Sequence, residues 1–344
     1  MKEKRKFAPW IAIIAVILAF ATVGAFRIVQ AVKQIRLSAS DGVALATALP
    51  KNGCRIYLLT GVDNAGFNSD VIMLVSVNEE LGKIGVLQIP RDSYVNIPGK
   101  SYHKINAIYS EACRIASNKG KSAEEAHKAG NIALADFLEE VFAIKIEGYA
   151  GVTTSGLARI VDGFGGVDVN IPKELSYDDN SQNLHIHLKA GINHLNGDLA
   201  VKFVRCRSYS NADYGRMNAQ KVFVAAMIKK LKGSMNITNG VSLVKCILSN
   251  VNTDMDASRL LPLAKTAIGF EAENVRMMNL VGSSVKVGSA YCEVLSVKVS
   301  QRIISECLFF GEKSAKDTVF DPSGKMNNTN DSEINRLYKA EKVS

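Results

Sequence analysis

Charged side chains follow an apolar, strand-like run within residues 85–109, which read GVLQIPRDSYVNIPGKSYHKINAIY. The apolar run stops at Pro90, and Arg91 and Asp92 come immediately after it. A proline fixes the local backbone, and rigid elements commonly position functional groups at their ends. A guanidinium beside a carboxylate in this place predicts the rim of an anion-binding site. An ordinary surface salt bridge is the alternative.

A second group of basic residues lies further along the chain. Arg205 and Arg207 stand two residues apart, where the chain leaves a helix that we expect to begin near Gly197. The segment DYGRMNAQK, residues 213–221, then opens a long helix. Free backbone N–H groups and the helix dipole attract anions at such a helix start. The two arginines favour an anion site here over a solvated helix face.

Two aspartates bracket a loop between two predicted strands, Asp63 in GVD and Asp70 in SD. Hard oxygen ligands suit Mg²⁺, which commonly keeps one or two carboxylates together with substrate phosphates. Loop aspartates also cap turns, and this is the alternative for both residues.

The IPRD segment, the IPG that follows it and the KIN-x-x-Y run at 104–109 resemble the LytR-CpsA-Psr family of Gram-positive cell-wall proteins. The resemblance extends from about Arg55 to about Gly233. It implies a membrane-anchored, Mg²⁺-dependent phosphotransferase that acts outside the cell. Its implied reaction moves a glycopolymer, of teichoic acid or capsular polysaccharide type, from a polyprenyl pyrophosphate carrier to peptidoglycan.

The same resemblance implies roles for individual residues of this sequence. The implied pyrophosphate-binding residues include the arginines above and residues of the KIN and D-x-G-R-x-x-x-Q positions: Arg91, Lys104, Arg205, Arg207, Arg216 and Gln220, with Asp213 opening the second motif. Asp63 and Asp70 match the implied Mg²⁺ ligands. The predicted catalytic residues are Arg91 and Asp92; Asp92 is a candidate general base, and a structural ion pair with Arg91 is the alternative.

The sequence departs from the family pattern at two places. Asn68 stands immediately before the Ser-Asp pair, where an arginine is usual, and an amide brings no charge to a phosphate. Ala112 and Cys113 replace a common Gly-Gly pair. The resemblance also implies an apolar cavity for the lipid carrier, and a filled core is the alternative because both are lined by the same residue types.

Composition and charge narrow the function classes. The chain has 344 residues, of which 47% are hydrophobic, enough for a sizeable core. Its net charge of +9 favours an anionic partner, and nucleic acid is not expected because no recognised nucleic-acid motif is present. Six cysteines form no C-x-x-C pair and therefore predict no zinc site. A non-catalytic, anchored protein that binds glycopolymers or regulates envelope assembly is the alternative to the enzyme.

The N-terminal region predicts a membrane anchor. Residues 1–6 are basic, and 7–26 form an uncharged apolar run of twenty residues, long enough as a helix to cross a bilayer. A signal peptide is the alternative, although the run exceeds the usual apolar core. The remaining predicted parts are a juxtamembrane stalk at 27–53, an extracellular catalytic domain at 54–311 and a polar, disordered tail at 312–344. The predicted location is the cell membrane, with a single pass.

Hydrophobic periodicity predicts an α/β or α+β layered fold with a central mixed sheet flanked by helices. We expect strands near 55–60, 71–77, 83–89, 145–150, 167–171, 184–188 and 275–281. We expect helices after a Ser122/Glu125 capping box, near 155–164, within 195–207 from Asn196 or Gly197, and near 213–231, 256–270 and 300–310. His185 and His187 should share one face of a strand, and His194 lies close in sequence. A solvent-facing pair is favoured over a metal site, and we assign these histidines no chemistry.

Overall fold

The computed structural model describes residues 53–64, 67–180, 184–206, 209, 212–234, 246–247, 249–255, 274–312, 314–321 and 325–326. The predicted anchor at 7–26 and the predicted helix at 256–270 lie outside these residues. No helix within the described ranges is both long and apolar enough to cross a bilayer.

A six-stranded mixed sheet forms the centre of the molecule, in the order β10-β3-β2-β1-β4-β9. The strands are β1 (Cys54–Val62), β2 (Ser69–Asn78), β3 (Lys83–Ile89), β4 (Ile146–Thr153), β9 (Val251–Thr253) and β10 (Val275–Asn279). The pairs β1–β2, β2–β3 and β4–β9 are antiparallel, whereas β1–β4 and β3–β10 are parallel. The central mixed sheet is therefore confirmed.

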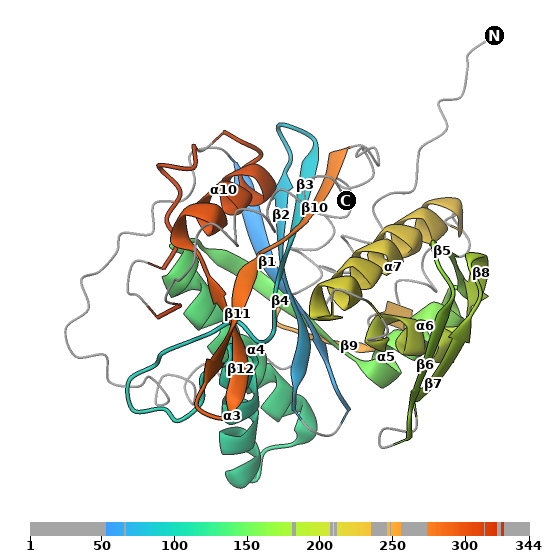
Figure 1. Cartoon of the computed structure of the whole chain (residues 1–344), viewed down its shortest axis with the longest axis horizontal. Helices are drawn as coiled ribbons and strands as arrows, with labels where there is room; N and C mark the ends of the chain where they lie inside the picture. Colours follow the sequence, from blue (N-terminus) through green and yellow to red (C-terminus); the bar gives the residue numbers. More distant parts are fainter. Residues whose placement is uncertain are drawn as a thin grey trace.

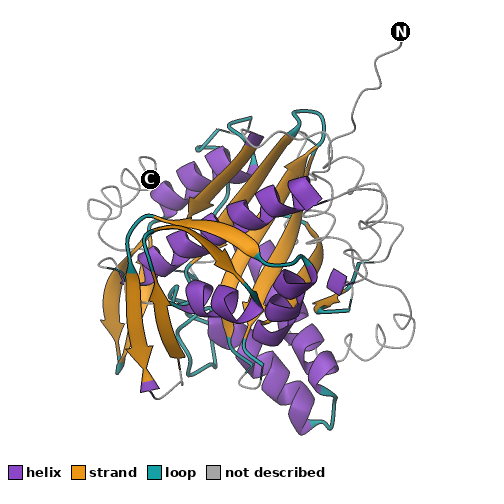
Figure 2. Ribbon diagram, turned by 90° about the vertical axis from the view of Figure 1, so that its right-hand side faces the viewer, coloured by secondary structure: helices purple, strands orange, loops and turns teal. Residues whose placement is uncertain are grey.

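Helices cover both faces of this sheet (Figure 1). One face carries α3 (Asn106–Asn118), α4 (Ala123–Phe142) and α10 (Val297–Leu308). The other carries α5 (Thr154–Gly163), α6 (Gly197–Arg205) and α7 (Ala212–Ser234), together with two hairpins. These hairpins pair β5 (Val167–Ile171) with β8 (Gly191–Leu195), and β6 (Leu175–Asp179) with β7 (Leu184–Leu188). Figure 2 shows the helices and the sheet from a second direction.

Alternation along the strands divides the interior into two cores. The side chains of Ile56, Leu58 and Ile72 belong to the core under α3, α4 and α10. Those of Tyr57 and Met73 belong to the core on the other face. Because successive strand residues point to opposite faces, a strand buried on both faces reads as a nearly continuous apolar run. This explains the runs RIYLLT and VIMLVSV in the sequence.

A further hairpin, β11 (Gly282–Val287) with β12 (Ala290–Leu295), lies along the segment that follows β3. Its loop places Gly288 at a φ of 60°, a conformation that glycine adopts at little cost. The backbone N–H of Tyr94 donates to the carbonyl of Glu293 at 2.8 Å, and Glu293 N–H donates to Asp92 O at 2.8 Å. The hairpin thereby supports the chain that carries Arg91 and Asp92.

The capping box ahead of α4 is confirmed. Ser122 accepts a hydrogen bond from the backbone of Glu125, and the Glu125 side chain accepts one from the backbone of Ser122. The expectation of a disordered tail from 312 onward is wrong for 314–321 and 325–326. Phe320 and Met326 are buried in the core beside α4 and α10, so the packed region continues past the predicted domain end at Gly311.

Candidate functional site

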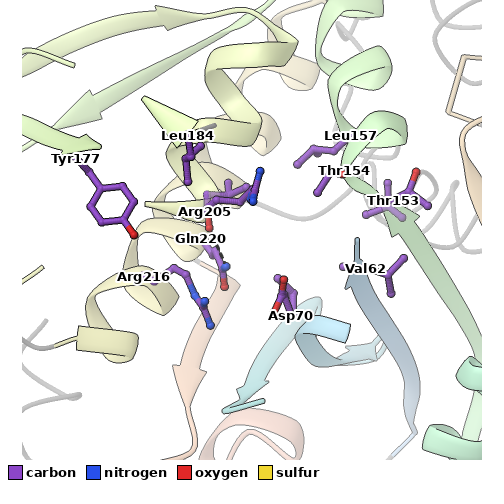
Figure 3. Close-up of a pocket in the computed structure, with 14 residues that line it drawn as sticks. Val62, Asp70, Thr153, Thr154, Leu157, Tyr177, Leu184, Arg205, Arg216 and Gln220 are labelled. Carbon is purple, nitrogen blue, oxygen red and sulfur yellow. Dashed lines mark hydrogen bonds between the residues drawn. The ribbon is translucent and has the colours of Figure 1, made fainter. Parts of the chain in front are cut away.

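A pocket opens between the sheet and the layer formed by α5, α6, α7 and the β6–β7 hairpin (Figure 3). It holds about 660 Å³ of empty space, including its open mouth. Its walls are largely apolar, with Val71, Val152, Leu157, Leu184 and Val204 among the lining residues. The remaining lining residues include three charged side chains and one amide: Asp70, Arg205, Arg216 and Gln220.

A β-bulge turns Asp70 into this pocket. Val62 pairs with Ser69, but the preceding residue Gly61 pairs with Val71, so Asp70 is the extra residue on β2. Strict alternation would place Asp70 and Val71 on opposite faces, yet both line the pocket. Bulges re-aim side chains in this way and are frequent next to active sites.

Arg91 lies in a tight turn at the end of β3 and forms an ion pair with Asp70. The N–H of Ser93 donates to the carbonyl of Pro90 at 3.0 Å, which closes the turn. Nη1 of Arg91 contacts Oδ1 of Asp70, and its Nε lies 3.9 Å from Oδ2 of Asp92. The structure therefore brings the IPRD segment and the Ser-Asp pair into contact.

Asp92 also contacts Lys104, whose Nζ lies 3.0 Å from its Oδ1. Charges of alternating sign thus run from Lys104 through Asp92 and Arg91 to Asp70. Asp92 had two predicted roles, general base and structural ion pair. Its contacts with two cations, and its place outside the pocket lining, favour the structural ion pair.

Arg205 and Arg216 reach the pocket from two different helices. Arg205 is the last residue of α6, whose first turn is capped by Asn196, and Arg216 belongs to the first half of α7. In Figure 3 their side chains and that of Asp70 extend into the same space from three elements. Arg216 is only 3% exposed. Arg207 and the side chain of Asp213, both predicted from sequence, lie outside the described residues.

Gln220 lies one turn beyond Arg216 and is almost fully buried. Its Nε2 donates to the carbonyl of Val204 at 3.0 Å, and its Oε1 accepts from Nε2 of Gln88 at 2.5 Å. The predicted phosphate ligand is therefore also a link between α7, α6 and β3.

Asn68 closes the loop between the two aspartates onto Asp63. Its backbone N–H and its Nδ2 donate to the Asp63 carboxylate at 3.1 and 2.8 Å. Phe67, at a φ of 52°, packs edge-on against His127 with ring centroids 5.2 Å apart. Nδ1 of His127 is hydrogen-bonded to the hydroxyl of Tyr109 at 2.8 Å. The loop is thus held by α3 and α4.

The titratable groups beneath this loop have shifted pKa values. Burial lowers the pKa of His127, and the nearby negative charge of Asp63 acts in the opposite direction. Burial raises the pKa of the Cys113 thiol to about 12 and also raises that of Tyr109. These three groups are therefore neutral near pH 7 and fill a structural role beside Asp63.

The two aspartates provide a donor set that fits Mg²⁺ in chemical kind. Val62 pairs with Ser69, so Asp63 and Asp70 each follow a paired residue at the same end of neighbouring strands. Carboxylate oxygens suit Mg²⁺, which completes its shell with water and phosphate oxygens. Among the residues described, no group of three or more His, Cys, Asp or Glu side chains could hold a metal. Asp63 and Asp70 therefore fit a Mg²⁺ ion whose other ligands include oxygens of a substrate phosphate.

The histidines of β7 and β8 are exposed to solvent, which was the favoured prediction for His185 and His187. His185 and His187 lie 2.8 and 3.3 Å from Oδ1 of Asp178, and His194 lies 2.6 Å from Asp168. All three side chains are about half exposed or more. Leu184, at the start of β7, is buried and lines the pocket instead.

Comparison with known proteins identifies the family. The LytR-CpsA-Psr family model matches residues 28–305, most of the chain. The chain belongs to the LytR-CpsA-Psr family. The IPRD motif of this LytR-CpsA-Psr protein contains Arg91 and Asp92, and its KIN-x-x-Y motif begins with Lys104. The two motifs meet in the ion pair between Lys104 and Asp92.

Two curated relatives carry transferase names. The chain is 29% identical over 253 residues to the polyisoprenyl-teichoic acid–peptidoglycan teichoic acid transferase TagU of Oceanobacillus iheyensis, covering 72% of this chain and 73% of the relative. It is 27% identical over 227 residues to TagV of Bacillus subtilis, a transferase of the same description, covering 64% of this chain and 53% of TagV. The chain thus spans only about half of TagV.

The fold is shared with a solved structure. The crystal structure of B. subtilis TagV superposes with a TM-score of 0.59 at 23% identity, covering 76% of this chain and 99% of that chain. The mixed α/β architecture described above is therefore that of a LytR-CpsA-Psr protein.

Several residues that line the pocket belong to no sequence motif and had no predicted role. Thr153 and Thr154 begin α5, and Tyr177 lies on β6, a strand that the analysis did not predict. The alternation of LHIHL placed His185 and His187 on one face of a strand but gave no sign that Leu184 would line a pocket. His127 had no predicted role, although it lies in the helix that follows the capping box.

Proposed function

We propose that this protein is a Mg²⁺-dependent phosphotransferase that moves a glycopolymer of teichoic acid or capsular polysaccharide type from polyprenyl pyrophosphate to peptidoglycan. The observation that carries the proposal is the convergence of Arg205 and Arg216 with the Arg91–Asp70 pair at an apolar pocket. Three guanidinium groups against the carboxylates of Asp70 and Asp92 leave positive charge in excess, which suits a diphosphate. The apolar walls suit a prenyl chain.

In this proposal the acceptor hydroxyl attacks the sugar-side phosphorus. A new P–O bond forms, the bond from that phosphorus to the bridging oxygen breaks, polyprenyl phosphate leaves with the electron pair, and the hydroxyl proton passes to solvent. Such reactions depend mainly on positioning and charge stabilisation. Mg²⁺ would neutralise phosphate charge when held by Asp70 and Asp63. The arginines bind and orient the diphosphate, and Arg91 also holds Asp70 and Asp92 in place.

The proposed setting is the cell membrane, with a single-pass anchor at 7–26 and the catalytic domain outside the cell. Four of the first six residues are basic, which favours a cytoplasmic N-terminus. The names of the TagU and TagV relatives support both substrates, a polyisoprenyl-linked teichoic acid and peptidoglycan.

The test uses the full-length chain in a mild detergent with Mg²⁺, a polyprenyl-pyrophosphate saccharide and un-crosslinked peptidoglycan. Wild type is compared with Arg91→Ala and Asp70→Ala. Arg114→Ala is the control, because Arg114 is an exposed arginine paired with Glu111 and is not among the residues that line the pocket. The proposal expects saccharide on peptidoglycan with wild type and with the control, and a large loss with the other two variants.

Asn68 is the observation that favours a second function, a non-catalytic glycopolymer-binding protein. Its backbone N–H and its side-chain amide each donate to one oxygen of Asp63, and the residue supplies no positive charge. If the lipid-linked saccharide binds to wild type but no phosphate bond is broken at any Mg²⁺ concentration, the binding function replaces the transferase. Release of lipid phosphate without transfer would instead indicate a hydrolase or an unsuitable acceptor.

A further inference from the structure

A pair of buried side-chain amides, Gln88 and Gln220, lies where the sheet meets α7. Gln88 is 2% exposed and Gln220 is 4% exposed. Nε2 of Gln88 donates to Oε1 of Gln220 at 2.5 Å, and Nε2 of Gln220 donates to the carbonyl of Val204 at 3.0 Å. Among the residues described, Oε1 of Gln88 has no hydrogen-bond partner, so Gln220 supplies the side-chain hydrogen bond of this amide.

These two hydrogen bonds connect the three segments that carry the arginines. Gln88 lies on β3, three residues before Arg91. Val204 directly precedes Arg205 at the end of α6. Gln220 itself lies four residues, about one helical turn, after Arg216 on α7. The amide pair therefore links the three segments on which the guanidinium groups lie.

We propose that Gln88 and Gln220 are positioning residues that set the spacing of Arg91, Arg205 and Arg216 for a diphosphate. The inference rests on the proposed function and assigns Gln220 a different role from that of a phosphate ligand. Both heteroatoms of the Gln220 amide already bond to protein atoms. Gln88 is not among the pocket-lining residues and reaches the ligand only through Gln220. A buried amide is costly unless it is hydrogen-bonded, so the pair resists separation.

The competing role for Gln220 is direct contact with the diphosphate, because Gln220 does line the pocket. The two roles differ in what they predict for Gln88. If Gln220 acts as a ligand, loss of the Gln88 amide has little effect on anion binding. If the two amides act as a unit, removing either one displaces the arginine-bearing segments to a similar extent.

The experiment measures binding of inorganic pyrophosphate, with Mg²⁺ present, to the full-length chain by titration calorimetry. Gln88→Met and Gln220→Met each replace an amide with an apolar side chain of similar length. Asn131→Leu is the matched control, because Asn131 is a fully buried amide, bonded to Thr60 at 2.7 Å, on the opposite face of the sheet. Urea unfolding of each variant separates loss of stability from loss of affinity.

We expect Gln88→Met and Gln220→Met each to weaken pyrophosphate binding by about tenfold, the effect of roughly 1.4 kcal/mol. The double variant should be no weaker than the weaker single variant. In an Arg205→Ala background, Gln88→Met should have a smaller effect than in wild type. Asn131→Leu should lose stability with unchanged affinity. If Gln88→Met is unstable, Gln88→Asn moves the amide away by one methylene and gives the same test.

Wild-type affinity in Gln88→Met beside a large loss in Gln220→Met would overturn the positioning role and make Gln220 a ligand. Additive effects in the double variant would also overturn it. Wild type that binds pyrophosphate but transfers no saccharide contradicts the proposed function alone. Wild type that binds no pyrophosphate contradicts both.

Discussion

Arg91 contacts acidic side chains from two segments, Asp70 on β2 and Asp92 in its own turn. The IPRD motif identified this arginine in the sequence, and the Ser-Asp pair marked Asp70 as an implied Mg²⁺ ligand, but the ion pair between the two residues was not predicted. The direction of the Asp70 side chain was not predictable from alternation, because a bulge at Gly61/Val62 reverses it. Motifs therefore predicted the identity of the charged residues, whereas their geometry depends on strand pairing.

Arg91→Lys should reduce saccharide transfer by about tenfold or more, although the charge is retained. Lysine offers a point charge in place of the planar fork, and each lost charged hydrogen bond costs about 1.5–3 kcal/mol. Initial rates of transfer measure the effect. Arg114→Lys, a change of the same kind at an exposed ion pair, should leave the rate unchanged. Equal rates for wild type and Arg91→Lys would mean that the planar guanidinium group of Arg91 has no role in transfer beyond its charge.

At the scale of elements, α3 and α4 pack together closely at Gly130. A Cβ at this position would lie 2.6 Å from Sγ of Cys113 and 2.8 Å from the ring of Tyr109. Cys113 stands where the family commonly has a glycine pair, and α3 continues through it to Asn118. The contact therefore fixes Tyr109, and through it His127, beneath the Asp63 loop.

Gly130→Ala should lower the free energy of unfolding by about 1–3 kcal/mol, because overpacking outweighs the higher helix propensity of alanine. Urea denaturation measures the change. Cys113→Ala removes the nearest clashing atom, so Gly130→Ala should cost less in that background than in wild type. A stabilising effect of Gly130→Ala in the wild-type background would contradict the close packing.

The sequence predicted the apolar strands and the capped helices well, and it missed elements that depend on distant partners. β3 and β5 have the predicted bounds, and α4 begins at its capping box. By contrast, α3 has no side-chain cap to mark its start. β6 is half exposed and polar, so its pairing with β7 is visible only in three dimensions. Gly288 was an available signal for the β11–β12 hairpin.

At the scale of the whole molecule, the C-terminal segment connects the core to the site. Phe320 packs edge-on against Phe142 at 5.3 Å, and the N–H of Asp321 donates to the carbonyl of Val141 at 2.7 Å. The carbonyl of Lys325 accepts from the N–H of Asn96 at 2.7 Å, within the segment between Arg91 and Lys104. Polar composition predicted a disordered tail, whereas Phe320 and Met326 of this segment are buried in the core.

A chain ending at residue 312 should unfold at a lower urea concentration than one ending at residue 326, because it lacks the buried Phe320 and Met326. The shorter chain should also exchange the Asn96 amide hydrogen faster, which hydrogen-exchange mass spectrometry measures on peptides from 91–104. Peptides from β2 serve as the internal reference. Identical exchange of Asn96 in both chains would show that the segment does not support the site.

The ion pair between Arg91 and Asp70 makes the entry of anion and cation interdependent. Each side chain neutralises the other, so a diphosphate that takes Arg91 exposes negative charge on Asp70, and Mg²⁺ that takes Asp70 releases Arg91. Diphosphate and Mg²⁺ therefore each free the side chain that binds the other. The binding of one should raise the affinity for the other by the same factor in both directions. Pyrophosphate affinity, corrected for the complex formed in solution, should rise with Mg²⁺ in wild type. That rise should be smaller in Asp70→Asn, and an equal rise in both proteins would exclude the exchange of partners.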